Sequence, residues 1–135
     1  MTKIVIDTNI FVSAALSPVG NPAKIIAKIS SSSEIQVLYS ADILAEYSRV
    51  LSYKRLGIAD EMRTNIITSL LAFGTLVEPA VSTIPLPDET DRIFYDAAQV
   101  SGAILVTGNI KHFPKEPFIM TPADFLRKIE YQPRT

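Results

Sequence analysis

Short runs of β-branched and aliphatic residues alternate with helix-like segments along the chain, and this alternation limits the folds that it can adopt. Apolar residues at helical spacing fill most of the intervals between strand candidates. Such an order predicts an α/β fold, in which a parallel sheet is covered by helices on both faces. The strand candidates span residues 3–6, 35–39, 75–77, 103–106 and 118–120; the helix candidates span 10–16, 23–29, 42–53 and 59–73, and two more begin at Asp88 and Pro122.

Proline, glycine and serine mark the expected loops. A turn cluster occupies residues 17–22, and the four serines at 30–33 predict a loop. The proline-rich stretch at 84–87 leads to the helix that we expect Asp88 to open. Pro122 stands where proline is favoured, at the first position of the last helix.

Composition is that of one ordinary globular domain. The chain has 135 residues, of which 47% are hydrophobic and 20% charged, so we expect a single domain over residues 1–135 with a polar tail after Tyr131. Cysteine is absent, which excludes disulfides, thiolate metal sites and cysteine nucleophiles and agrees with a cytoplasmic location. No apolar run is long enough to span a bilayer, and the polar residues at 7–9 argue against a signal peptide.

The charge balance does not favour a protein that coats nucleic acid. Thirteen basic and 14 acidic residues give a formal charge of -1. However, four of the acids, Asp88, Glu89, Asp91 and Asp96, lie in one short segment. Divalent ions bound there would leave the remaining surface net basic, so the overall charge does not decide the matter.

Two strand ends carry polar residues. In open α/β sheets, ligands bind at the carboxyl ends of strands near a reversal of strand order. Asp7 follows the first strand candidate, and Thr107 and Asn109 follow the strand at 103–106. Each has an ordinary explanation as well: Asp7 suits a helix N-cap, and Asn109 suits a turn that uses left-handed geometry.

Three further acids lie on expected helices. Glu46 falls at the border of an apolar stripe, where it would be solvated or point into a cleft. Asp88 and Asp91 have the spacing of a capping box, so they would cap a helix or bind a cation. His112 is the only histidine, and we interpret it as a loop residue or an RNA contact rather than as a metal ligand or general base.

Together these oxygen-bearing side chains suit a Mg²⁺ or Mn²⁺ site, since both ions prefer carboxylate ligands. Two such ions about 3.5 to 4 Å apart can activate water and stabilise the leaving oxygen of a phosphodiester. Catalysis of this kind requires no nucleophilic side chain. A chain without cysteine and with one histidine offers few components for a catalytic triad.

An ordered set of motifs resembles the PIN domain. The set is VIDTN at 5–9, Glu46, PDETD at 87–91 with Ala97 and Ala98, and LVTGN at 105–109. KHFP at 111–114 and TPADFL at 121–126 are similar to bacterial and archaeal PIN proteins that act as VapC-like toxins of toxin-antitoxin systems. The order and spacing cover nearly the whole chain.

The resemblance implies a three-layer α/β/α sandwich with a parallel sheet of about five strands, and a Mg²⁺- or Mn²⁺-dependent endoribonuclease. A homodimer and a protein antitoxin are further implied partners. By position, Asp7, Glu46 and Asp91 match the three core acids and metal ligands. Asp88 is an additional carboxylate, and Asp91 is preferred to it by its spacing to Asn109.

Asparagine at position 109 departs from the family, which often has aspartate there. The change removes a negative charge and is expected to weaken one metal site. Thr107 would orient a ligand or water through its hydroxyl, and Asn9 would form a hydrogen bond near Asp7.

Two other functions remain open from the sequence. A binding module could keep this fold and sequester RNA or a protein partner, which the asparagine at 109 makes credible; the exposed face expected at 59–73 would suit a dimer or antitoxin contact. A receiver or phosphatase domain shares the strand-end aspartate. However, the chain lacks the second aspartate of a phosphatase-like start, and Lys115 precedes its strand candidate rather than following one.

Overall fold

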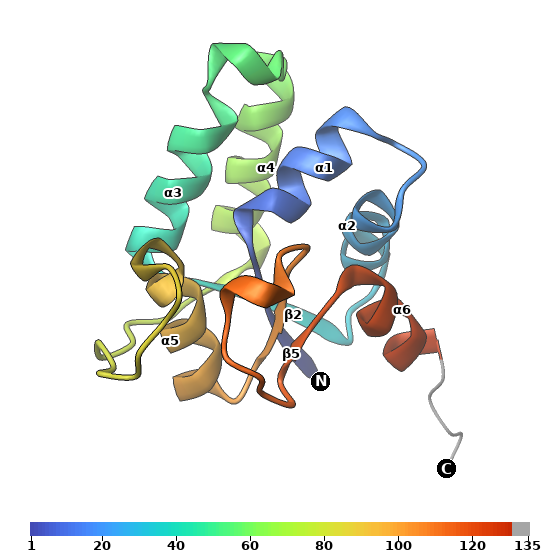
Figure 1. The fold of residues 1–135 in the computed structure, drawn as a ribbon. Coiled ribbons are helices and arrows are strands. Elements are labelled where there is room, and N and C mark those ends of the chain that lie inside the picture. Colours follow the sequence, from blue (N-terminus) through green and yellow to red (C-terminus); the bar gives the residue numbers. More distant parts are fainter. Residues whose placement is uncertain (131–135) are drawn as a thin grey trace.

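A five-stranded, all-parallel sheet forms the centre of the molecule, in the order β3-β2-β1-β4-β5. The computed structural model describes residues 1–130, so the polar tail expected after Tyr131 lies outside the described part of the chain. Figure 1 shows the sheet between its helices. The strands are β1 (Thr2–Ile6), β2 (Ile35–Tyr39), β3 (Thr75–Leu76), β4 (Ile104–Val106) and β5 (Ile119–Met120).

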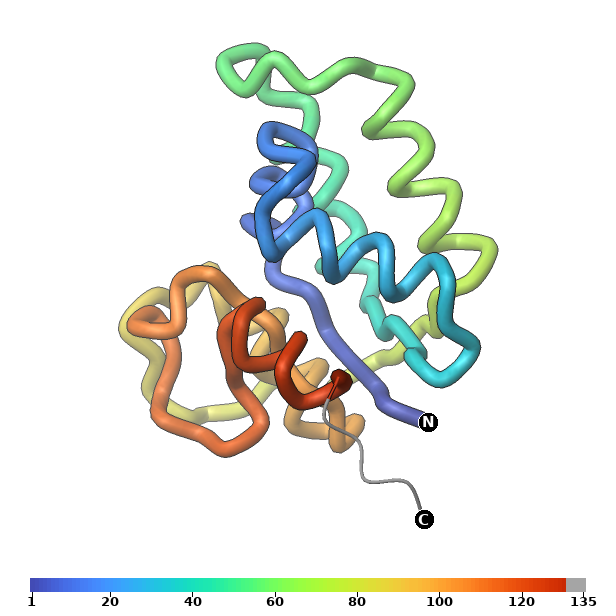
Figure 2. The backbone as a smooth tube through the Cα atoms, turned by 90° about the vertical axis from the view of Figure 1, so that its right-hand side faces the viewer, coloured from blue at the N-terminus to red at the C-terminus, as the bar shows by residue number. Residues whose placement is uncertain are grey.

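In the described part of the chain, six helices cover the sheet and complete the predicted three-layer sandwich. Seen from the side, α2 and α4 lie on one side of β1 and α5 lies on the other (Figure 2). The helices are α1 (Thr8–Leu16), α2 (Asn21–Ser31), α3 (Ala41–Leu51), α4 (Asp60–Phe73), α5 (Arg92–Ser101) and α6 (Pro122–Glu130), with short 3-10 helices η1 (Lys54–Leu56), η2 (Glu89–Asp91) and η3 (Ile110–His112).

The prediction of a loop at the four serines is wrong in part. Ser30 and Ser31 belong to α2, and their hydroxyls donate to the carbonyls of Ile26 and Lys28 one turn earlier, at 3.0 and 3.3 Å. The helix expected from Asp88 also differs. Asp88 caps η2, and α5 itself begins only at Arg92.

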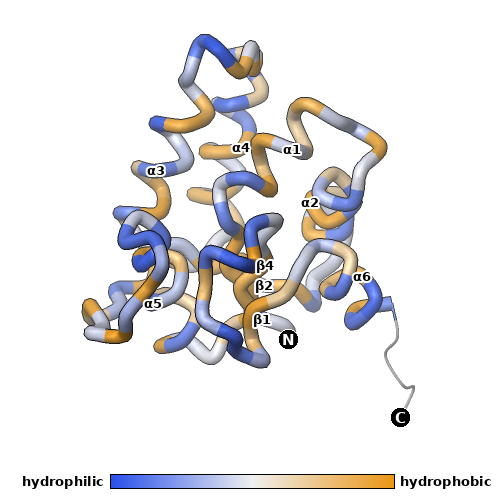
Figure 3. Tube along the Cα trace, in the orientation of Figure 1, coloured by the Kyte–Doolittle hydropathy of each residue, from blue (hydrophilic) through white to orange (hydrophobic). Residues whose placement is uncertain are grey.

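The core is built on the central strand. Ile4, Val5 and Ile6 of β1 are at most 1% exposed, because helices cover both faces of the sheet. Figure 3 shows the hydrophobic colour concentrated at the strands and on the inward faces of the helices. Within residues 1–130, no single helix has the length and apolarity needed to cross a membrane, although α1 and α2, bent by 103° at their junction, pass that test as a pair.

Gly74 ends α4 where no side chain fits. A Cβ there would lie 2.6 Å from the Leu70 carbonyl oxygen and 2.9 Å from the Tyr39 ring. We therefore expect Gly74→Ala to lower the free energy of unfolding by about 1–3 kcal/mol, measured by urea denaturation. Gly20→Ala is the control, because the nearest atom to its Cβ would be 3.6 Å away, and its effect should stay within about 0.5 kcal/mol. Equal effects of the two substitutions would contradict the steric explanation.

Candidate metal centre

The reversal of strand order lies between β1 and β4, which are neighbours in the sheet although β2 and β3 come between them in the chain. Ile6 is in register with Val106, and the backbone N–H of Asp7 donates to the Val106 carbonyl at 3.0 Å. This pairing brings Asp7 beside Thr107 at the carboxyl ends of the two strands. The topology thus creates the kind of crevice in which α/β proteins bind ligands.

Two hydrogen bonds hold the Asp7 side chain. Its Oδ2 accepts hydrogen bonds from the Thr107 hydroxyl at 2.6 Å and from Asn9 Nδ2 at 3.1 Å. Asn9 Oδ1 in turn accepts from the backbone N–H of Gly108 at 3.2 Å. Although Asp7 occupies the N-cap position of α1, its side chain makes no capping hydrogen bond. The carboxylate is therefore bonded to Thr107 and Asn9 rather than used to cap the helix.

Burial makes the Asp7 carboxylate energetically unfavourable. Only 6% of Asp7 is exposed, and this burial raises the pKa of its carboxyl group above the ordinary value. The Thr107 hydroxyl and the backbone amides of Thr8 and Asn9 offset part of that rise, because they favour the charged form. A cation at the crevice would relieve the remaining cost.

Asp88 and Asp91 lie at the two ends of η2, Asp88 as its N-cap and Asp91 as its last residue. Asp88 Oδ1 accepts from the backbone N–H and the hydroxyl of Thr90, at 3.0 and 2.7 Å, and these bonds lower the pKa of Asp88. The capping explanation of Asp88 is therefore confirmed, but only one of its oxygens is used. Asp91 stands at the N-cap of α5 without capping it.

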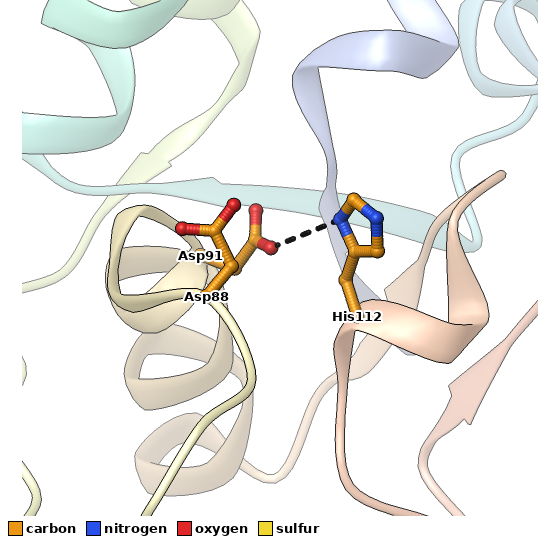
Figure 4. A group of neighbouring side chains, drawn as sticks. All are labelled: Asp88, Asp91 and His112. Carbon is orange, nitrogen blue, oxygen red and sulfur yellow. Dashed lines mark ion pairs between the residues drawn. The ribbon is translucent and has the colours of Figure 1, made fainter.

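His112 completes a group of donors with these two aspartates. One ligand atom from each of Asp88, Asp91 and His112 lies within 4.8 Å of the other two. Figure 4 shows the carboxylates on one turn and the imidazole facing them from η3, with His112 Nδ1 3.5 Å from Asp91 Oδ2. The interpretation of His112 as a loop residue is thus incomplete, because the fold turns its ring toward the acids. Its position after a strand end was the only signal in the sequence.

The negative charge of Asp91 lies in an unfavourable environment. Burial first, and then the charges of Asp7 and Asp88, raise its pKa to about 6, while His112 opposes the rise. Its Oδ2 is buried and accepts no hydrogen bond from residues 1–130. A buried carboxylate oxygen without a donor fits a metal ligand. Two carboxylates and an imidazole suit Mn²⁺ better than Mg²⁺, which prefers oxygen alone.

Glu46 lies apart from that donor group. It is on α3, its side chain is 25% exposed, and its Oε2 pairs with Arg49 Nη2 at 2.6 Å on the same helix. Its neighbour Tyr47 is fully buried and donates from its hydroxyl to the Ile6 carbonyl, which precedes Asp7. The role of Glu46 as a metal ligand stays a prediction. No sequence pattern predicted the hydrogen bond from Tyr47 to the Ile6 carbonyl.

Asn109 contributes mainly through its backbone. Its N–H donates to the Thr107 hydroxyl at 3.0 Å, and its carbonyl accepts from the N–H of His112 at 2.9 Å. The expected left-handed turn is wrong, since φ at Asn109 is −115°. Asn109 links the Thr107–Asp7 hydrogen bond to the turn that carries His112, and its exposed side chain is free to face a ligand.

A family model of the PIN domain matches residues 3–111, more than half of the chain. The chain therefore belongs to the PIN domain family. An uncharacterized protein of Methanocaldococcus jannaschii is 34% identical to it over 110 residues, which cover 79% of this chain and 70% of that protein.

Three solved structures share the fold. VapBC2 from Rickettsia felis, bound to a promoter DNA fragment, has a TM-score of 0.58 at 19% identity and covers 89% of this chain and 97% of its own. A protein from Pyrobaculum aerophilum has 0.57 at 21%, covering 97% and 91%. VapBC-1 from nontypeable Haemophilus influenzae has 0.55 at 19%, covering 97% and 96%. This chain thus has the fold found in VapBC toxin-antitoxin complexes.

Proposed function

We propose that this protein is a divalent-metal-dependent endoribonuclease and the toxin of a toxin-antitoxin pair. The observation that carries the proposal is the group of Asp88, Asp91 and His112 donors beside the buried Asp7, at the reversal of strand order. PIN domains are typically nucleases. Carboxylates that gather beside an imidazole, one of them with a strongly raised pKa, are characteristic of a functional site.

The proposed ligands are Asp7, Asp91 and Glu46, with Asp88 as a further catalytic carboxylate and His112 as a donor that the structure adds to this set. A bound Mn²⁺ or Mg²⁺ supplies an activated water and a positive charge for the phosphate. Thr107 and Asn9 hold Asp7 in one orientation through their hydrogen bonds to its Oδ2. Such partners of a ligand keep a site pre-organised.

Cleavage assays with purified protein test the proposal. We expect wild-type protein to cut single-stranded RNA with Mn²⁺ and to lose activity in EDTA. Asp7→Asn keeps the side-chain size but removes a charge, so cleavage should fall by about 10²-fold or more. Asp124→Asn is the matched control, since Asp124 is an exposed acid on α6.

Three outcomes separate the alternatives. Equal activity of Asp7→Asn and wild type would contradict the proposed role of Asp7 in cleavage. Cleavage of DNA but not RNA would contradict the substrate class. Saturable RNA binding without cleavage, retained in Asp91→Asn, would support the second candidate, an inactive binding module. The exposed asparagine at 109, one charge short of the family's usual aspartate, is the observation that favours that candidate.

The proposed protein partner is an antitoxin, as in the VapBC complexes that share this fold. An apolar groove of ≈ 820 Å³ between α2 and α4 supports it. Met62 and Phe73 of α4 line the groove and are 42% and 85% exposed, and exposed apolar surface of this kind marks protein contacts. A second copy of the chain is the other proposed partner. Light scattering of the purified chain, alone and co-expressed with its genomic neighbour, distinguishes the two.

A further inference from the structure

The loop of residues 77–88 connects β3 to the metal centre, and its last residue is Asp88. It contains no helix or strand. A loop of this length without regular structure is normally mobile. Here it ends at Asp88, a proposed catalytic carboxylate that must stay close to the negative charge of Asp91. Hydrogen bonds to two side chains of α5 hold the loop in place.

Arg92, the first residue of α5, binds the loop at three points. Its Nη1 donates to the carbonyl and the hydroxyl of Ser82, at 3.0 and 2.9 Å, and its Nη2 donates to the carbonyl of Ile84 at 2.7 Å. The same guanidinium makes a two-bond ion pair with Glu89 in η2, at 2.7 and 2.5 Å. Its side chain is only 14% exposed. Arg92 therefore joins the loop, η2 and α5 at one guanidinium group.

Asp96, one turn later on α5, binds the loop from the other side of Ser82. Its Oδ2 accepts from the backbone N–H of Ser82 at 3.0 Å, so the N–H, carbonyl and hydroxyl of this single loop residue are all bonded to α5. Asp96 is 3% exposed, and its Oδ1 has no partner in the described part of the chain. Keeping a carboxylate buried with one oxygen unpaired is unfavourable. The fold nevertheless retains it at this contact.

The hydrogen bonds that hold the loop oppose the repulsion between Asp88 and the neighbouring acid. Asp88 and Asp91 are like charges whose ligand atoms lie within 4.8 Å of one another in the group with His112, so they repel each other. Without a metal, a free loop would relax by moving Asp88 away. Binding would then have to reverse that movement, and the affinity would fall accordingly.

We infer that Arg92 and Asp96 are positioning residues that pre-organise the metal centre by fixing the loop at Ser82. Neither touches the proposed metal: Arg92 acts through Glu89 and the loop, and Asp96 acts through Ser82. The inference rests on the proposed function, which makes this a metal site. It is tested by metal affinity, whereas the proposed function is tested by RNA cleavage.

Mn²⁺ binding, measured by electron paramagnetic resonance of the free ion with no RNA present, tests the inference. Arg92→Ala and Asp96→Ala should each weaken Mn²⁺ binding by about 10- to 100-fold, the range for residues that orient ligands. Asp96→Asn keeps an oxygen for the Ser82 N–H and should restore binding to within about 3-fold of wild type. Arg63→Ala is the control, since Arg63 also bonds a serine and an aspartate, but on α4.

Circular dichroism at the temperature of the titration shows whether each variant is folded, so that lost affinity is not mistaken for unfolding. Should the alanine variants not fold, Arg92→Lys keeps the charge without the planar set of donors and should still bind Mn²⁺ more weakly. Folded Arg92 or Asp96 variants with wild-type affinity would overturn the inference. Wild type that binds Mn²⁺ without cutting RNA overturns only the nuclease proposal, whereas wild type that binds no Mn²⁺ overturns both.

Discussion

Replacing Asp91 by asparagine is expected to stabilise the metal-free protein while it removes metal binding. Burial and the charges of Asp7 and Asp88 raise the pKa of Asp91 to about 6 in the folded protein, above its ordinary value of 3.8. The folded state therefore binds more protons than the unfolded state between these pH values, and stability falls as pH rises through that window. Asparagine resembles the neutral acid. Because solvent screens a partly exposed group, Asp91→Asn should gain less than the full shift implies, about 1–2 kcal/mol at pH 7, and almost nothing at pH 4.

The order of stability should reverse when metal is added. We expect Mn²⁺ to stabilise the wild-type folded state by mass action, whereas the variant lacks one of the proposed ligands. Urea denaturation of both proteins at pH 4 and pH 7, with EDTA or with excess Mn²⁺, measures the difference in unfolding free energy under each condition. Asp124→Asn, which removes an exposed acid, should show neither the gain nor the reversal. A variant less stable than wild type at pH 7 in EDTA would mean that Asp91 is a structural residue rather than a strained ligand.

The strands were the most predictable part of the fold, for a physical reason. β1 and β2 are buried on both faces, so they appear as short apolar runs, and the predicted 35–39 matches β2 residue for residue. Helix ends were harder to predict because local bonds decide them. α2 continues through Ser31, with two serine hydroxyls bonded to its carbonyls, because serine is found within helices as well as at their ends, so its presence alone does not fix the helix boundary.

The site was predictable where it depends on strand ends and not where it depends on packing. Asp7 and Thr107 follow β1 and β4, and a parallel sheet with a reversal between them brings these ends together. The approach of His112 to Asp91 depends on how η3 is placed against α5, which no local pattern encodes. The same holds for Asp96, a charged residue that lies buried in α5 because a loop residue distant in sequence meets it there.

Tyr47 is expected to be the side chain whose truncation affects stability most, because it joins the core to the metal centre. Its ring is fully buried and packs edge-on against Phe11, with ring centroids 4.9 Å apart, and against Phe94 at 6.2 Å. Tyr47→Ala would leave a cavity the size of the ring and should cost about 3–5 kcal/mol in urea denaturation. An effect below about 1 kcal/mol would contradict a close-packed position.

The conservative variant separates the ring of Tyr47 from its hydroxyl. Tyr47→Phe keeps the packing but removes the hydrogen bond to the Ile6 carbonyl, so it should cost about 1–3 kcal/mol, because a buried acceptor loses its donor. Tyr95→Phe is the matched control: Tyr95 is equally buried, but its hydroxyl lies 3.5 Å from Glu116 Oε1, at the limit of a hydrogen bond, and its loss should cost less than about 1 kcal/mol. Since Ile6 precedes Asp7, Mn²⁺ titration should also show weaker binding in Tyr47→Phe and unchanged binding in Tyr95→Phe. Equal metal affinity in the two variants would limit Tyr47 to the core and leave Asp7 oriented by Thr107 and Asn9 alone.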